Sequence, residues 1–175
     1  MFPLNGKFGT KEVTNRTASG VPSGVRLAPG PDGKANGSYE FNGACSSYIE
    51  FPNSDGGALD VHYSMTMLCC LFYDGKDGPV FDYVAGYAVH FWASHGKLFV
   101  TFNKRDNSPT AALLHTTLAG GWKFVGASYN RDSGEAQLWI DGVMVHTLNI
   151  GEGLELATQY SVRMGVRSGD VLKVF

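Results

Sequence analysis

The sequence has few charged residues, no basic run and no long apolar run, and each shortage excludes a class of protein. Only 17% of its 175 residues are charged and its formal net charge is -2. The electrostatic footprint of a protein that binds nucleic acid or an anionic membrane is therefore missing. No stretch of the sequence approaches the roughly 18 apolar residues of a membrane span. We expect neither a nucleic-acid partner nor membrane insertion.

Cysteines are also scarce, and their spacing does not suit a metal cluster. The sequence contains Cys45, Cys69 and Cys70. Cys69 and Cys70 are neighbours on an expected strand, so their side chains point to opposite faces and at most one of them reaches Cys45. One disulfide with one remaining thiol, or three buried thiols, are both compatible with the sequence.

Glycine and aromatic residues are abundant instead. The 23 glycines and the aromatic content of 13% are typical of a turn-rich β protein with stacking surfaces. The sequence shows no sustained helical period. About a dozen short alternating segments separated by turn residues predict an all-β sandwich or jelly roll. The length suits one domain, which we assign to residues 1–175.

The segment 122–148 is predicted to form three consecutive antiparallel strands. Asp141-Gly142 is its strongest turn signal, because a type I′ turn needs positive φ at both central residues. Together with a turn at 131–134, it predicts a register that puts one set of side chains on a buried face. The predicted pairs are Tyr129 with Ala136, Ala127 with Leu138, Val125 with Ile140, Ile140 with Val143, and Leu138 with Val145. The opposite face carries Trp139 and His146, with Gly126 leaving room for the indole.

Three further segments carry expectations about the sheets. Phe2 to Phe8 is predicted as a short edge strand. Tyr63 to Tyr73 is the most apolar segment, and because both of its faces are apolar we expect a strand in the middle of a packed sheet. Val171 to Phe175 is expected to close the chain as a short final strand.

The pattern in residues 122–142 resembles the laminin-G-like jelly roll of the concanavalin-A-like lectin group. It consists of a Trp, an apolar strand ending in Tyr, a short Asp/Ser/Gly turn, and a strand closing on aromatic-aliphatic-Asp-Gly. The matching residues are Trp122, Val125, Tyr129, Asp132, Gly134, Leu138, Trp139, Ile140, Asp141 and Gly142. The resemblance extends from Phe2 to Asp170, although the final strand is shorter than in the family. It implies a two-sheet antiparallel jelly-roll sandwich.

The resemblance also implies a function. It suggests a non-catalytic extracellular recognition or adhesion module that binds protein or glycan partners. The first residues carry no secretory signal, so we expect a piece excised from a larger extracellular protein or from the ectodomain of a membrane protein. Asn15 and Asn36 both fit the N-glycosylation acceptor pattern. A stand-alone carbohydrate-binding lectin is the first alternative.

A glycoside hydrolase on the same fold is the second alternative. It would need two carboxylates about 5–10 Å apart on either side of the scissile bond. Glu152 and Glu155 lie in a glycine-containing loop, and Pro52 and turn residues separate Glu50 from Asp55, so neither pair has strand spacing. We therefore predict that the chain is not an enzyme.

Calcium is the one cofactor that the resemblance suggests. Family members often hold an ion at the sandwich rim through carboxylate and carbonyl oxygens, which hard cations prefer. Matching the loops implies Asp77 and Asp170 as ligands. Arg167 would repel a cation nearby, and the alternative is that both carboxylates are solvated turn residues.

Aromatic side chains are the candidates for ligand binding. Amphipathic rings suit sugar faces and protein hot spots, because they bury a large area at a low cost in side-chain entropy. The candidates are Tyr87, His90, Trp92, Trp139 and His146. The alternative interpretation is that these rings simply pack within the sandwich.

Overall fold

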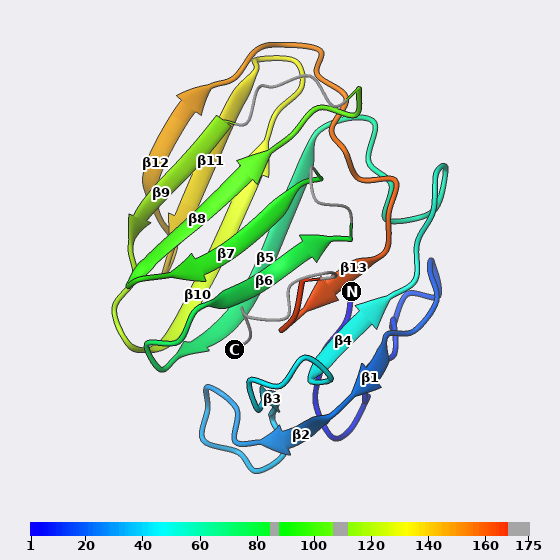
Figure 1. Ribbon diagram of the computed structural model, residues 1–175, viewed down its shortest axis with the longest axis vertical. Coiled ribbons are helices and arrows are strands. Elements are labelled where there is room, and N and C mark those ends of the chain that lie inside the picture. Colours follow the sequence, from blue (N-terminus) through cyan, green and yellow to red (C-terminus); the bar gives the residue numbers. More distant parts are fainter. Residues whose placement is uncertain (85–87, 107–111, 168–175) are drawn as a thin grey trace.

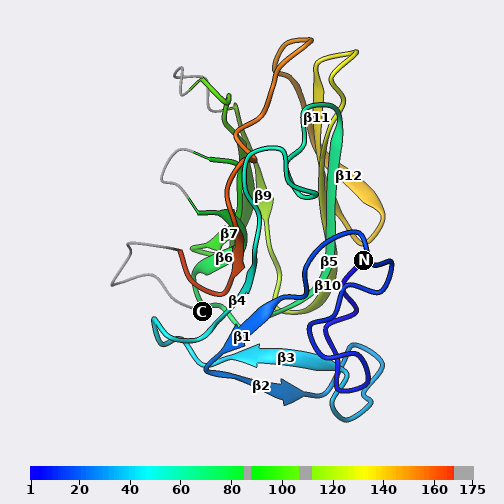
Figure 2. The same ribbon diagram turned by 90° about the vertical axis from the view of Figure 1, so that its right-hand side faces the viewer.

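The computed structural model describes residues 1–84, 88–106 and 112–167. Two antiparallel sheets lie face to face in it (Figures 1 and 2). All elements in these ranges are strands, as the abundance of glycine turns and the missing helical period predicted. No helix that could cross a membrane occurs in the same ranges. The all-β sandwich is therefore confirmed.

The larger sheet has seven strands and the smaller has four. The seven-stranded sheet contains, in spatial order, β1 (Val21–Ser23), β4 (Tyr48–Phe51), β13 (Val162–Met164), β6 (Gly78–Tyr83), β7 (His90–Ser94), β8 (Lys97–Phe102) and β9 (Ala112–Thr117). The four-stranded sheet contains β12 (Val143–Asn149), β11 (Glu135–Ile140), β10 (Gly121–Tyr129) and β5 (Met65–Tyr73). A separate pair, β2 (Val25–Ala28) and β3 (Ser38–Phe41), lies below both sheets in Figure 1.

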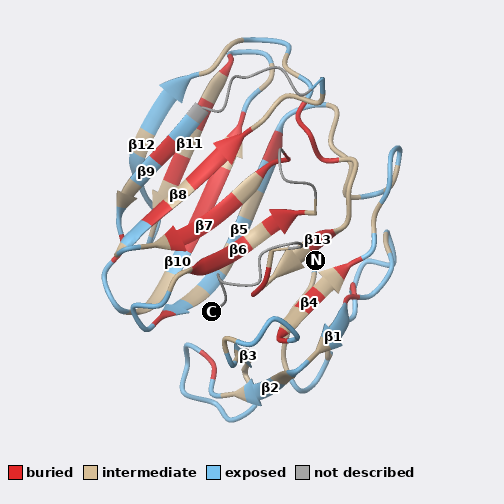
Figure 3. Ribbon diagram, in the orientation of Figure 1, coloured by how far each residue is buried: buried red, intermediate tan, exposed pale blue. Residues whose placement is uncertain are grey.

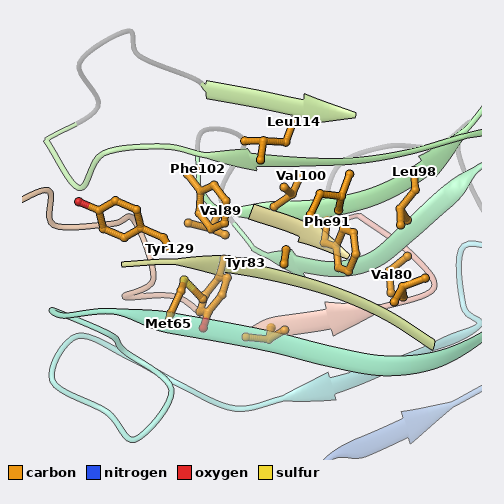
Figure 4. Close-up of a cluster of buried hydrophobic side chains, with 14 of the residues drawn as sticks. Met65, Val80, Tyr83, Val89, Phe91, Leu98, Val100, Phe102, Leu114 and Tyr129 are labelled. Atoms are coloured by element: carbon orange, nitrogen blue, oxygen red, sulfur yellow. The ribbon is translucent and has the colours of Figure 1, made fainter. Parts of the chain in front are cut away.

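The hydrophobic core fills the space between the two sheets (Figure 4). Because side chains alternate along a strand, every second residue enters this layer and its neighbours face outward. The largest fully buried apolar side chains are Tyr129, Phe91, Phe102, Ile49, Leu98, Leu114, Leu138 and Leu156. Figure 3 shows that buried residues gather on β6, β7, β8 and β10. Both sheets therefore have a distinct outer face.

The register predicted for residues 122–148 is largely confirmed. The pairs Val125–Ile140, Ala127–Leu138, Tyr129–Ala136 and Ile140–Val143 all occur. Asp141 has φ 51° and Gly142 has φ 80°, as a type I′ turn requires. Val125 and Leu138 are fully buried, and Ile140 packs against the core.

One predicted pair in this segment is wrong. Leu138 pairs with His146 and not with Val145, because a β-bulge interrupts the register between Leu138 and Trp139. The extra residue turns His146 away from the face of Trp139. Its Nδ1 lies 3.1 Å from the backbone nitrogen and 3.0 Å from the carbonyl oxygen of His115 in β9. His146 therefore joins the edges of the two sheets and takes no part in an outer surface.

Val143 also differs from the expectation, since 63% of it is exposed. It lies next to the turn on β12, which is the last strand of its sheet. An edge strand has a neighbour on one side only, so its apolar residues are less completely covered. The buried layer thus ends at Ile140 and does not extend to the hairpin tip.

Two strand predictions need correction. Phe2 to Phe8 forms turns and a single bridge between Asn5 and Gly9, with no regular strand. β5 forms as predicted but is an edge strand of the four-stranded sheet, with its outward side chains exposed. Apolar residues on both faces of this segment predicted a strand covered on both sides. The outer face of this sheet is apolar but exposed, so the prediction was wrong. The predicted strand 171–175 lies outside the described residues.

The three cysteines all lie in the described ranges, and no disulfide joins them. Cys69 and Cys70 point to opposite faces, as predicted. Cys45 and Cys70 are exposed, so neither of the two states derived from the sequence occurs. Burial raises the pKa of the Cys69 thiol to about 12, which makes it unreactive at neutral pH.

Candidate functional site

The outer face of the four-stranded sheet carries a cluster of large apolar side chains. We call Leu68, Phe72, Trp122, Phe124, Trp139 and Met144 the apolar patch. Leu68 and Phe72 are each 54% exposed, Phe124 is 45% exposed and Met144 is 44% exposed. The two tryptophans are half-buried beside them. Exposed apolar residues that gather on one face of a protein mark a surface for interaction.

The strand register explains why these side chains meet. Phe72 pairs with Trp122, and their rings contact edge to face with centroids 5.5 Å apart. Gly126 pairs with Leu68 on one side and with Trp139 on the other, and Trp139 pairs with Met144. These residues therefore form two rows across the sheet, one with Phe72 and Trp122 and one with Leu68, Trp139 and Met144. Phe124, which pairs with Cys70, lies between the two rows.

Gly126 allows Leu68 to pack closely over the β10 backbone. A Cβ placed there would lie 2.5 Å from Cδ2 of Leu68 and 3.7 Å from Cβ of Trp139. The sequence predicted that this glycine makes room for the indole. In the structure the space above Gly126 is taken by Leu68, which reaches across the β10 backbone toward Trp139.

A charged pair borders one end of the patch. The backbone N–H of Phe124 donates to Oδ1 of Asp141 at 2.9 Å, and Nζ of Lys123 lies 3.2 Å from the other carboxylate oxygen. These two bonds, the backbone bond first, hold the pKa of Asp141 below its usual value. The bond to Phe124 also ties the hairpin turn to β10 and fixes the edge of the patch.

A polar hollow lies at the other end of the same face. Its volume is about 280 Å³, and it is lined by Ser64, Thr66, Ser128, Tyr129, Asn130, Glu135 and Gln137. Within the described part of the chain, the side chains of Thr66, Ser128 and Gln137 make no hydrogen bond. Their donors and acceptors are therefore available to a ligand next to the apolar patch.

The structure describes four of the five candidate rings predicted from the sequence and does not bring them together. Trp139 lies in the apolar patch, whereas His90 and Trp92 lie on the outer face of the seven-stranded sheet. Trp92 is only 5% exposed and stacks on Phe99 at a centroid distance of 6.5 Å. A side chain this buried offers no stacking surface. Tyr87 lies outside the described residues.

His90 is half-buried beside Trp92. Its Nδ1 lies 3.1 Å from the carbonyl oxygen of Ala88, and its ring meets Phe99 edge to face. Burial lowers the pKa of His90, and the charge of Arg167 lowers it further, against the opposing effect of the Ala88 carbonyl. A neutral, packed imidazole is the result.

The predicted calcium ligands are only partly described, since Asp170 lies outside the described residues. Asp77 is a hairpin-capping residue. Its carboxylate accepts hydrogen bonds from Oγ of Ser94 at 2.8 Å and from the backbone N–H of His95 at 2.6 Å. An ion at Asp77 would compete with these bonds. Calcium binding at this position stays a prediction.

A second candidate for a cation site lies at the rim of the sandwich. Asp55, Asp60 and His62 each offer an atom within 4.8 Å of the others, which is close enough for one cation. The guanidinium of Arg105 already contacts all three, with Nη1 2.8 Å from Asp55, Nη2 hydrogen-bonded to Asp60, and Nη2 3.2 Å from His62. The arginine supplies the positive charge that a metal would supply.

Asp60 is the most constrained acid in this rim group. Its side chain is fully buried, and burial by itself raises the pKa of a carboxyl group. Hydrogen bonds from the Gly56 N–H, from Thr158 and from Arg105 outweigh burial and lower the pKa of Asp60. Arg105 itself lies in a turn that follows β8.

The predicted glycosylation sites are accessible. Asn15 and Asn36 are both exposed, and both have positive φ, at 55° and 60°. Such positions lie in turns, where a bulky sugar meets little of the folded chain.

Sequence reasoning missed most of the apolar patch. Only Trp139 was a candidate, because Leu68 and Phe72 belong to a segment that we expected to be covered on both faces. The usable signal was the alternation of Phe124, Gly126 and Ser128 opposite the buried residues of β10, which already put an aromatic ring on the outer face.

The arrangement defines an all-β sandwich with one apolar outer face. No protein-family model and no curated protein matches the sequence. Solved structures of botulinum neurotoxin binding domains do match the fold. One, a binding domain of botulinum neurotoxin DC in complex with rat synaptotagmin II, has a TM-score of 0.73 and 13% identity, over 92% of this chain and 42% of that chain.

Two further structures are similar. The binding domain of botulinum neurotoxin DC in complex with SialylT has a TM-score of 0.71 and 13% identity, over 92% of this chain and 42% of that chain. A structure of botulinum neurotoxin type C, whose cell entry is described as dependent upon interaction with two ganglioside molecules, has a TM-score of 0.68 and 12% identity, over 90% of this chain and 40% of that one. The chain thus spans about two fifths of these proteins' length, and the likeness is one of fold.

Proposed function

We propose that this chain is a non-catalytic recognition module of the laminin-G-like, concanavalin-A-like jelly-roll class that binds a glycan on the outer face of its four-stranded sheet. The observation that carries the proposal is the apolar patch beside the polar hollow on one face. A sugar ring has an apolar face that stacks on aromatic rings and a rim of hydroxyl groups that needs hydrogen-bond partners. Trp139 and Phe124 supply the first, and Gln137 and Ser128 supply the second.

The similar structures support this choice of ligand. Two of them are described in terms of SialylT or gangliosides, which carry sugars. Because the sequence identity is low, the similar structures do not identify the binding residues of this chain, and those residues are inferred from its own surface. Exposed asparagines at 15 and 36 support placing the module in the extracellular space or in the ectodomain of a membrane protein.

The rim acids support a non-catalytic role. A glycoside hydrolase needs one carboxyl group with a raised pKa to act as general acid. Asp60 and Asp55 are instead bound to the Arg105 guanidinium, and the pKa of Asp60 is lowered. A carboxyl group with a lowered pKa, such as that of Asp60, has the opposite of the required property.

A protein segment is the second candidate for the same face. Leu68 and Met144 are exposed aliphatic residues, which contribute to protein interfaces more than to sugar stacking. The synaptotagmin complex of a similar fold supports this alternative. Both candidates use the same patch, so one set of variants tests both.

The experiment is a glycan array probed with the intact chain and with three variants. We expect binding to one class of glycan that is lost in Trp139→Ala and weakened about tenfold or more in Gln137→Ala, since each removes a main contact. Leu113→Ala is the control, because Leu113 is 49% exposed on the outer face of the other sheet. Binding that survives Trp139→Ala would contradict the proposal.

Calcium chloride titrated by calorimetry tests the separate prediction at Asp77.

A further inference from the structure

β5 is an edge strand, and within the part of the chain that the structure describes no strand pairs with its outer side. The directions of the backbone groups follow from β10. Phe124 donates its N–H to the Asp141 side chain and accepts from the Asp141 N–H at 2.7 Å, so its backbone groups point toward β11. In an antiparallel strand these directions alternate from residue to residue. Val125 therefore directs its backbone N–H and C=O groups toward β5, where it pairs with Cys69.

The alternation continues along β5. Cys69 and every second residue bond to β10, whereas Thr66, Leu68, Cys70 and Phe72 direct their N–H and C=O groups away from the sheet. Within the described part of the chain no backbone hydrogen bond reaches these four residues. The N-terminal segment packs Phe2 and Leu4 against the core, but its backbone bonds go to Val13, Asn36 and Asn5.

This edge lacks the features that usually prevent strands from associating. Natural proteins protect edge strands with charges, proline, bulges or short length. β5 has nine residues, MTMLCCLFY, with no charge, no proline and no glycine, and its register with β10 is uninterrupted. The other edges are protected. β1 has only three residues and contains Pro22, β12 carries a bulge, and His146 contacts the backbone of β9.

We propose that β5 is the dimerisation edge of this protein, and that it pairs antiparallel with β5 of a second copy about a twofold axis at Cys69. This register matches all nine residues, about 30 Å of strand. It sets Leu68 opposite the partner subunit's Cys70 and Thr66 opposite the partner subunit's Phe72. These are the outward-directed residues, so they form up to about eight backbone hydrogen bonds.

The dimer has a consequence for recognition. Two four-stranded sheets become one eight-stranded sheet, and the two apolar patches lie side by side on the same face because Leu68 and Phe72 adjoin the shared edge. A ligand with repeated units then meets two sites at once, which raises the overall affinity without new contacts. The pairing itself depends only on β5 and does not rest on the proposed function.

Sedimentation velocity over about 1–100 µM tests the proposal, with two substitutions at one residue. We expect the chain and Cys70→Ser to sediment with twice the monomer mass of 18.9 kDa. Cys70→Pro removes an outward N–H and leaves the β10 ladder intact, so its dissociation constant should rise at least a hundredfold with an unchanged circular dichroism spectrum. A monomeric chain throughout this range, or a dimer unaffected by Cys70→Pro, overturns the proposal.

A crosslinking measurement covers the case in which Cys70→Pro does not fold. Thr66→Cys and Phe72→Cys are introduced together in a chain in which Cys45 and Cys70 are replaced by serine and Cys69, which would face the partner subunit's Cys69, is replaced by alanine. Within one chain these positions are about 20 Å apart, so any disulfide between them joins two copies. The twofold register predicts a covalent dimer under mild oxidation, and Thr66→Cys alone should give none. No covalent dimer from the double variant, or equal yields from both, would rule out this pairing.

Discussion

Leu68 lies directly over Gly126, with its Cδ2 2.5 Å from the place where a Cβ of residue 126 would be. Leu68 of β5 thus covers the backbone of β10 at the residue that pairs with Trp139 of β11. Leu68 can take this position only because residue 126 has no side chain.

Gly126→Ala should disturb the patch through Leu68. The added methyl group meets the flexible end of a leucine side chain, so we expect a loss of about 1 kcal/mol in unfolding free energy. Leu68→Ala frees the space. A double-mutant cycle by chemical denaturation should therefore show a favourable coupling of about 1 kcal/mol between the two substitutions. Strict additivity would show that the contact is energetically unimportant.

Trp92→Ala should affect stability and leave ligand binding unchanged. Trp92 is almost fully buried against Phe99, and truncating a buried tryptophan costs about 3–5 kcal/mol. Thermal unfolding measures this loss, with Trp92→Phe as the milder control. If Trp92→Ala kept its stability but lost its ligand, the binding surface would lie on the other sheet.

Arg105→Leu should destabilise the protein in a pH-dependent way. It leaves the buried Asp60 carboxylate without its cation, which costs about 3 kcal/mol at neutral pH. The pKa of Asp60 is lowered in the folded protein, so its carboxylate stabilises the fold above the usual value of 3.8, and this contribution is lost as the pH falls through the folded pKa.

The difference between the protein and Arg105→Leu should therefore shrink as the pH falls below 3.8. Urea unfolding at several pH values measures it. Asp55→Asn is the matched control, because the Asp55 side chain is 81% exposed and its pair with Arg105 should contribute less than about 1 kcal/mol. A difference that stays constant with pH would mean that Asp60 is not the group involved.

Local turn chemistry made most of the β10-β11-β12 register predictable. Asp141-Gly142 fixes the second turn, and alternation fixes which of Val125 and Phe124 is buried. The bulge at Leu138 was not predictable, because a one-residue insertion into a pair leaves no mark in the alternation of either strand. It is the reason why His146 contacts His115 and not the surface of Trp139.

The candidate site was harder to predict than the fold. An apolar outer face looks the same in sequence as a face covered by another layer, so Leu68 and Phe72 were placed in the middle of a packed sheet. The same ambiguity affects aromatic residues, since Trp92 and Trp139 are equally plausible from alternation. Only the three-dimensional arrangement shows which of the two indoles is covered.

Ligands are proposed to bind on the outer face of the four-stranded sheet, and fluorine NMR of the tryptophans tests this most directly. The chain has three tryptophans, and labelling them with 5-fluorotryptophan gives one fluorine resonance for each of Trp92, Trp122 and Trp139, assigned by replacing each residue with phenylalanine. We predict that a glycan found on the array shifts the Trp139 and Trp122 resonances and leaves Trp92 unmoved. A shift confined to Trp92, or saturating binding that moves none of the three, would contradict the claim.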